Sequence, residues 1–277
     1  MNKLLSANFA RLWKNKVFWI GTAAMFIWTA LVLITEHQAT LKVPQYVRTL
    51  DVYFFKYALI TGGLCAVFTS LFVGTDYGDG TIRNKIIIGH TRKNIYLSNM
   101  TVCVVAGLVM SASSILAILT IGVPLFGWFD NNMMILVYLI ISMFMITAFV
   151  SVYTLTSMLN QNKASAVAVA FLVFLAILLL AGYCYNKLSE PKMTSGGVVI
   201  TTDNGIVLSE EYPNPYYVSG NIRAIYEFVV DFLPSGQSII ISSMEVDRPL
   251  WMLLYSLIIT TLTTITGIFI FKRKNLR

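Results

Sequence analysis

The stretch "MTVCVVAGLVMSASSILAILTIGVPL", residues 100–125, contains no charged side chain. At a rise of ~1.5 Å per residue, a helix of this length is roughly 39 Å long and exceeds a hydrocarbon core of ~30 Å. A bilayer offers no water to backbone N–H and C=O groups, so a segment inside it must satisfy them within a helix. The stretch therefore predicts a transmembrane α-helix.

Five further stretches of 18 or more residues also lack charged side chains, at 17–34, 57–75, 133–159, 164–185 and 249–271. Hydrophobic residues make up 57% of the 277-residue chain, and charged residues only 12%, against about 25% in soluble domains. None of the stretches has the strict alternation of a lipid-facing β-strand. The sequence predicts an all-α polytopic membrane protein with six transmembrane helices.

The distribution of charge predicts the orientation of these helices. If the N-terminus is cytoplasmic, thirteen of the twenty lysines and arginines lie in inner segments, and eleven of the thirteen acidic residues lie in outer ones. Lysine and arginine accumulate on the cytoplasmic side of membrane proteins. We expect a protein of the plasma membrane with both termini in the cytoplasm. The net charge of +7 then reflects topology, and nucleic acid is not an expected partner.

The predicted order of parts follows from these spans. It comprises an interfacial amphipathic helix (1–16), transmembrane helices 1–5 (17–185) with a cytoplasmic coupling loop (76–99), an extracellular cap (186–248), and transmembrane helix 6 with a basic tail (249–277). In the first part, Leu5, Phe9, Leu12 and Trp13 recur at helical spacing, which suits a helix in the lipid interface. The alternative is a basic flank that only sets the topology.

The extracellular cap is predicted to contain a hairpin and short helices on the membrane surface. "VVITTDNGIVLS" alternates around Asp203, Asn204 and Gly205, which is the pattern of a hairpin with its turn at these residues. "NIRAIYEFVVDFLP" predicts a helix, which Pro234 ends. "SGQSIIISS" is expected to form a further short apolar piece on that surface.

The predicted spans carry none of the groups that proton carriers, channels or intramembrane enzymes place there. They contain no Asp, Glu, Lys, Arg or His. The chain lacks HExxH, paired intramembrane carboxylates and the GxxxxGK[ST] loop that cradles ATP. We therefore expect no catalytic residue, no metal site and no cofactor. The many serines and threonines in the spans predict close helix packing with hydrogen bonds between helices.

The dense polar segment "GTDYGDGTIRNKIIIGHTRKNIYLSNM", residues 74–100, interrupts this apolar chain. Asp79 or Thr81 is expected to cap a short helix through "IRNKIII", with Arg83 and Lys85 pointing away from its isoleucine face. Gly89 is expected to end this helix, and the next helix should begin near Arg92. The segment predicts a cytoplasmic docking helix, and the alternative is a solvated loop.

In its loop and its architecture, the chain resembles the ABC type-2 permease family. The loop of those permeases has an acidic residue followed by Gly-Thr and a basic helix, then Gly, Arg and "iyls". In that family the loop is a coupling helix that fits a cleft on a separate ATPase. The resemblance implies ATPase-coupling roles for the matching positions, with Asn99 departing from a basic residue common at the start of the third span. These positions are Asp79, Gly80, Thr81, Arg83, Asn84, Lys85, Gly89 and Arg92.

The resemblance implies the permease subunit of an ATP-driven ABC exporter that works by alternating access. Two copies of the ATPase would bind ATP and Mg and supply hydrolysis in trans, so this chain itself would not be an enzyme. A second permease, either a copy or a paralogue, and membrane lipid are the other expected partners. The uncharged spans favour an apolar or amphipathic substrate such as an antimicrobial peptide. The alternative is a membrane-anchored sensor whose extracellular cap binds a ligand.

Overall fold

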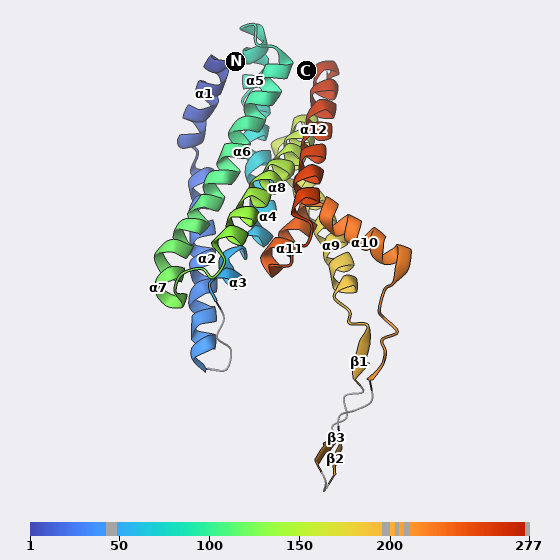
Figure 1. Cartoon of the computed structure of the whole chain (residues 1–277). Helices are drawn as coiled ribbons and strands as arrows, with labels where there is room; N and C mark the ends of the chain where they lie inside the picture. Colours follow the sequence, from blue (N-terminus) through green and yellow to red (C-terminus); the bar gives the residue numbers. More distant parts are fainter. Residues whose placement is uncertain (43–48, 196–199, 203–204, 208–210, 275–277) are drawn as a thin grey trace.

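The computed structural model describes residues 1–42, 49–195, 200–202, 205–207 and 211–274. In this part of the chain, six helices are long and apolar enough to cross a membrane, and they pack side by side (Figure 1). This confirms the prediction of an all-α, multi-pass chain. The six spans are α2 (Lys16–Lys42), α3 with α4 (Asp51–Gly78), α6 with η1 and α7 (Arg92–Phe126), α8 (Asn132–Leu159), α9 (Lys163–Leu188) and α12 (Pro249–Arg273).

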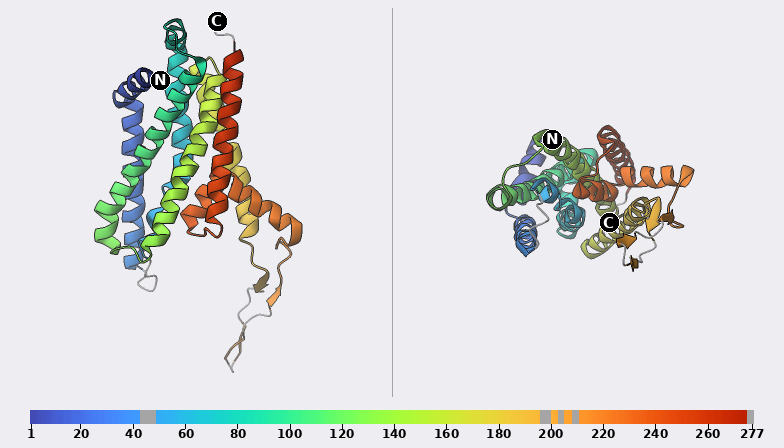
Figure 2. Two further views of the ribbon diagram at one scale, coloured as in Figure 1. Left: turned by 45° about the horizontal axis from the view of Figure 1, so that its top comes forward. Right: turned by 60° about the horizontal axis from the view of Figure 1, so that its bottom comes forward.

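The helical bundle has two chemically different ends. Helix α1 (Asn2–Trp13), helix α5 (Thr81–Ile87) and both chain termini lie at one end, which we call the basic end (Figures 1 and 2). A narrow β-ribbon projects from the other end, which we call the ribbon end. An even number of spans places both termini at one end, as the charge pattern predicts.

Helix α4 (Ala58–Gly78) lies at the centre of the bundle, against α8 and α9. A Cβ atom at Gly62 of α4 would lie 2.7 Å from the ring of Phe174 on α9, so any larger residue here would displace that ring. Hydroxyl groups join other pairs of helices, as when Thr263 of α12 donates to Ser151 of α8 at 2.8 Å. The predicted role of the serines and threonines in packing is confirmed at these positions.

The third span changes its helical winding before it ends. Helix α6 (Arg92–Ala117) passes into a π-helix, η1 (Ile118–Gly122), and then into α7 (Val123–Phe126). Pro124 has no N–H for the carbonyl four residues earlier, and its ring clashes with that carbonyl. Widening to i→i+5 hydrogen bonds accommodates the proline within a continuous span.

Helix α1 packs against α6, and its buried face differs from the predicted one. Leu4, Asn8 and Leu12 are buried, whereas Trp13, predicted on the apolar face, is exposed. The buried face of α1 is shifted by one residue, from Leu5 and Phe9 to Leu4 and Asn8. Asn8 is buried because it donates hydrogen bonds to side chains of α6. The first helix is therefore part of the protein core at the basic end.

The β-ribbon consists of two antiparallel strand pairs. β1 (Met193–Ser195) pairs with β4 (Glu211–Pro213), and β2 (Ile200–Thr202) pairs with β3 (Gly205–Val207). The predicted hairpin is present, with Thr202 opposite Gly205. Gly205 thus belongs to a strand and not to the turn, and the predicted turn residues Asp203 and Asn204 lie outside the described residues.

Two helices follow the ribbon, and the second corrects the prediction of a cap that rests on the membrane surface. α10 (Gly220–Phe232) ends before Pro234 as predicted, and α11 (Pro234–Ser243) then runs at 93° to it. α11 packs among α4, α8 and α9, with most of its residues buried (Figure 1). The "SGQSIIISS" segment therefore lies inside the ribbon end of the bundle.

Candidate functional site

The polar segment at the basic end folds into α5, a helix of seven residues with defined ends. Gly80 precedes it with φ = 67°, a left-handed conformation that glycine adopts without strain. Neither Asp79 nor Thr81 caps the helix through its side chain, so that expectation is wrong. The Thr81 hydroxyl instead donates to the Asp76 main-chain carbonyl and carboxylate.

The other end of α5 carries a Schellman motif. The N–H of Gly89 donates to the carbonyl of Ile86, and the N–H of His90 donates to that of Lys85. Gly89 has φ = 97°, and it ends the helix as the sequence predicts. The next helix, α6, then begins at Arg92 with Thr91 as its N-cap. Both ends of α5 are thus fixed by backbone hydrogen bonds.

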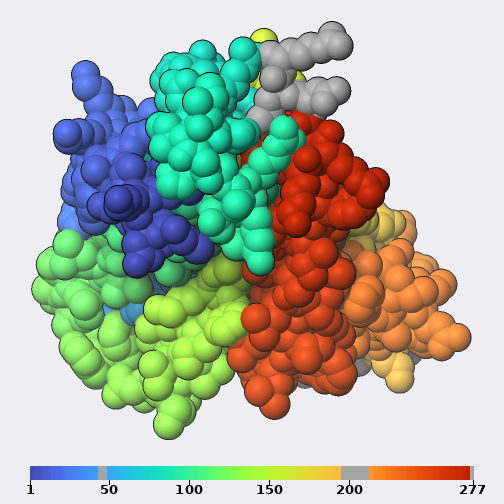
Figure 3. Space-filling view, turned by 90° about the horizontal axis from the view of Figure 1, so that it is seen from above, coloured from blue at the N-terminus to red at the C-terminus, as the bar shows by residue number. Residues whose placement is uncertain are grey.

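One face of α5 packs onto the bundle and the other is open to solvent. Ile82 is buried, and Lys85 points inward rather than outward as expected. Arg83 and Asn84 are exposed, and the open face ends in Ile87 and Ile88, which are 80% and 77% exposed. Figure 3 shows this segment, in teal, standing uncovered at the basic end between α1 and α12.

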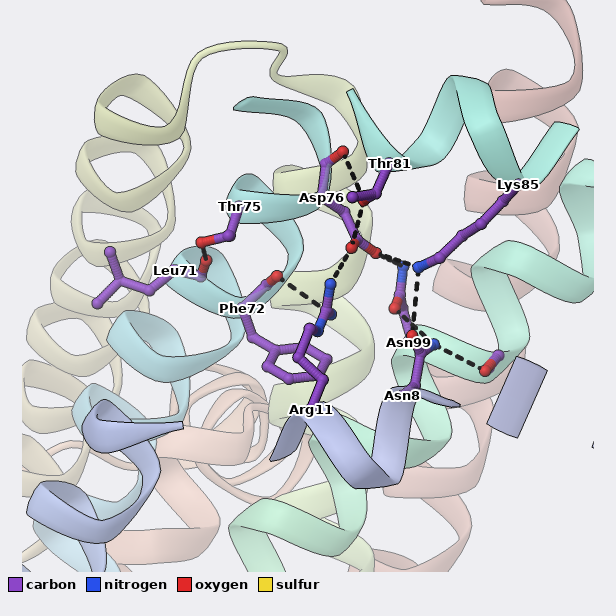
Figure 4. Close-up of polar contacts among 10 residues, drawn as sticks. Asn8, Arg11, Leu71, Phe72, Thr75, Asp76, Thr81, Lys85 and Asn99 are labelled. Atoms are coloured by element: carbon purple, nitrogen blue, oxygen red, sulfur yellow. Dashed lines mark hydrogen bonds and ion pairs between the residues drawn. The ribbon is translucent and has the colours of Figure 1, made fainter. Parts of the chain in front are cut away.

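Beneath α5 lies Asp76, a fully buried carboxylate in the last turn of α4 (Figure 4). Its Oδ1 accepts from the Arg11 guanidinium of α1 and from the Thr81 hydroxyl at 2.8 Å. Its Oδ2 accepts from Lys85 Nζ at 2.8 Å and from Asn99 Nδ2 at 3.0 Å. Four donors from three helices, α1, α5 and α6, therefore converge on one side chain.

This carboxylate is part of a closed ring of hydrogen bonds. Lys85 donates to Asn8 Oδ1 at 3.2 Å, Asn8 donates to Asn99 Oδ1 at 3.0 Å, and Asn99 donates back to Asp76. Asn8 also donates to the Ser98 hydroxyl at 2.9 Å. We call Asn8, Arg11, Asp76, Lys85 and Asn99 the Asp76 cluster. It joins α1, α4, α5 and α6 at one point.

The electrostatics of the Asp76 cluster explain its composition. A carboxylate in the last turn of a helix faces the negative end of the helix dipole, which is unfavourable. The positive charges of Arg11 and Lys85 offset this unfavourable interaction. Burial lowers the pKa of Arg11 to about 10, so its guanidinium remains protonated at neutral pH. Asn99 donates to Asp76 without adding a third buried positive charge.

Arg92, which the resemblance places among the coupling residues, lies apart from the Asp76 cluster. Its guanidinium donates to main-chain carbonyls at the end of α12. Asp79 is exposed at the end of α4. The predicted residues Gly80, Thr81, Arg83, Asn84, Lys85 and Gly89 do come together, on or beside α5.

The sequence pattern did not predict a site role for four residues: Asn8, Arg11, Asp76 and Ser98. Asp76 carried a weak signal, because it is one of only two acidic residues among the segments predicted to be inside. Its partners are 65 residues away in α1 and 23 residues away in α6, and sequence spacing does not relate such distant positions.

Neither a metal-binding group among the described residues nor a matching relative identifies the site. Among the described residues, no group of three or more His, Cys, Asp or Glu side chains could hold a metal ion. Comparison of the sequence with models of protein families and with curated proteins gave no match. Function is therefore inferred from α5 and the Asp76 cluster, together with the resemblance of the loop.

Proposed function

We propose that this chain is the permease subunit of an ATP-driven ABC exporter and that α5 is the helix that docks on its separate ATPase. The exposed Ile87 and Ile88 carry this proposal. They stand at the tip of a helix beyond the ends of the membrane spans, so lipid tails do not account for their exposure. Adjacent apolar side chains beside an exposed arginine, here Arg83, are typical of the centre of a protein–protein interface.

The attachment of α5 to the bundle suits a helix that transmits force. Lys85 and Thr81 tie α5 to Asp76, and Asp76 in turn is held by Arg11 of α1 and Asn99 of α6. A push on α5 would therefore move the ends of three other helices together. In the proposed exporter, ATP binding closes the ATPase pair, and this movement opens the spans outward.

The outward surfaces of the spans leave room for a second permease. Only 17% of the apolar window of α12 and 22% of that of α9 are buried within this chain, against 61% for the central span. In the proposed complex, lipid and a second permease, either a copy or a paralogue, cover these helices. Two ATPase copies bind ATP and Mg at the cytoplasmic face of the plasma membrane.

The substrate class follows from the same surfaces. The spans offer apolar and hydroxyl side chains along most of their length, and the ion pairs of the Asp76 cluster lie at the basic end. Such a route suits an apolar or amphipathic molecule, for example an antimicrobial peptide, better than an ion or a sugar. The substrate is thus proposed by chemistry, and export is proposed from the resemblance.

Co-purification with a P-loop ATPase tests this proposal. We expect the gene for that ATPase beside the gene for this chain, and the two proteins should purify as a complex after co-expression. Ile87→Asp should weaken the complex about 30-fold, because truncating or charging an interface hot spot costs ~2 kcal/mol or more. Ile222→Asp is the matched control, since Ile222 is 57% exposed on α10.

Two results would overturn the proposal. One is that Ile87→Asp does not weaken the complex with the ATPase any more than the control Ile222→Asp does. The other is a wild-type chain that binds no ATPase, in which case binding of a ligand to the ribbon and α10 would favour the sensor alternative.

A further inference from the structure

Arg92 joins the start of the third span to the end of the sixth. It is the first residue of α6, and its Nη1 donates to the carbonyls of Phe271, Lys272 and Lys274 at 2.9, 3.1 and 2.5 Å. The last carbonyls of a helix have no partners within it. A guanidinium there satisfies them and complements the negative end of the helix dipole.

Lys274, one residue beyond α12, makes the corresponding contact with the fourth span. Its Nζ donates to the carbonyls of Met158 and Leu159, the last residues of α8, at 2.8 and 2.9 Å. The same ammonium lies 4.6 Å from the ring centroid of Tyr77 in α4, and Tyr77 donates to the Met158 carbonyl at 2.7 Å. Burial lowers the pKa of Lys274 to about 8, so the side chain is mostly protonated at neutral pH.

These contacts form a chain of attachments that begins at α5. Only Ile88–Thr91 separate α5 from Arg92. From Arg92 the contacts continue to the end of α12, and from Lys274 to the ends of α8 and α4. They share no side chain with the Asp76 cluster, which connects α5 to α1, α4 and α6.

We propose that Arg92 and Lys274 are positioning residues that pass movement of α5 to the sixth and fourth spans. This inference rests on the proposed function, because it assigns these residues to the same coupling pathway. The Asp76 cluster would then move α1 and the second and third spans, and the Arg92–Lys274 contacts would move the sixth and fourth. Lys274, immediately after α12, is thereby one of the residues that transmit the movement.

The test measures the movement itself in the complex with the ATPase. Leu41→Cys at the ribbon end of α2 and Leu250→Cys at that end of α12 carry spin labels, in a chain whose native Cys65, Cys103 and Cys184 are replaced. Both leucines are well exposed, at 68% and 78%. The distance between the labels is recorded without nucleotide and with ATP plus vanadate, together with ATP hydrolysis and the melting temperature.

We expect ATP to change this distance in the otherwise wild-type complex. Lys274→Met should make the change at least about twofold smaller, while ATPase binding persists, because one of two attachments is lost. Lys274→Arg should restore it, since arginine can also donate to the two α8 carbonyls. Arg273→Met is the matched control, because Arg273 packs over Phe269 of its own helix at 4.1 Å.

If ATP changes the distance between the spin labels equally in Lys274→Met and in wild type, the inference is overturned and the proposed function stays intact. A wild-type complex that forms but shows no ATP-driven change, or no complex at all, would overturn both. Should Lys274→Met fail to fold, Arg92→Lys serves instead. It keeps the charge but cannot reach three carbonyls, and an unaltered distance change in this variant would also overturn the inference.

Discussion

Asp76 shows how one buried charge organises the basic end. Its carboxylate is fully buried yet accepts from four donors, which fills its capacity as an acceptor. A buried carboxylate without partners would be very costly, whereas a saturated one fixes the positions of all its donors. The energetic dependence is mutual, because Arg11 and Lys85 would be left as desolvated cations without it.

Asp76→Ala should therefore destabilise the isolated chain strongly. Removing one partner from a buried ion pair costs about 3–5 kcal/mol, and here two cations lose their counter-charge. Asp79→Ala, three residues later and exposed, should change stability by less than about 0.5 kcal/mol. Denaturant titration of the detergent-solubilised protein compares the two, and equal stabilities would contradict the account of the cluster.

Residues differ in how far sequence alone predicts their roles. Gly89 could be predicted because a helix that ends in a left-handed residue is a local pattern. Lys85 could not, because its inward direction depends on Asp76 and on Asn8, 77 residues away. Arg92 was predicted at the correct helix start, but its partners lie about 180 residues away at the other end of the chain.

At the scale of elements, the sequence pattern predicted the long spans and α10 but not the position of α11. The long spans follow from uncharged stretches, and α10 follows from its spacing and Pro234. The "SGQSIIISS" segment was predicted as a short apolar piece on the membrane surface, whereas α11 packs inside the bundle. Gln237 is nonetheless fully buried: it donates to the carbonyls of Asp231 and Met252 and accepts from the Ser256 hydroxyl.

Gly236→Ala should disrupt the α10–α11 corner. A Cβ atom at Gly236 would lie 2.1 Å from the carbonyl oxygen of Val230, so the backbone must shift, at a cost of about 1–3 kcal/mol. Gly182→Ala in α9 is the control, because nothing lies within 4 Å of its Cβ position. We expect a lower melting temperature in detergent for Gly236→Ala alone, and equal values would show that α11 is not held closely against α10.

At the scale of the whole molecule, the asymmetry between the two ends determines the expected orientation. The basic end gathers α1, α5 and the end of α12, and the ribbon end carries most of the acidic residues. The positive-inside rule then places the basic end in the cytoplasm. That placement is also what an ATPase requires, because ATP is in the cytoplasm.

Cysteine labelling in intact cells tests this orientation. On a background without Cys65, Cys103 and Cys184, a membrane-impermeant maleimide should label Tyr216→Cys near the ribbon and should not label Lys93→Cys at the start of α6. Both native residues are exposed. Permeabilised cells provide the control in which both positions react. Labelling of Lys93→Cys from outside would show that the topology is the reverse of the expected one.

The central claim, that α5 docks on an ATPase, is tested most directly by cross-linking. Ile87→Cys, in the same cysteine-free chain co-expressed with the P-loop ATPase, is treated in native membranes with a short bifunctional maleimide–amine reagent. We predict a covalent product with the mass of one permease plus one ATPase, absent for Tyr216→Cys. An ATPase that co-purifies with the chain but never cross-links to position 87 would contradict the account.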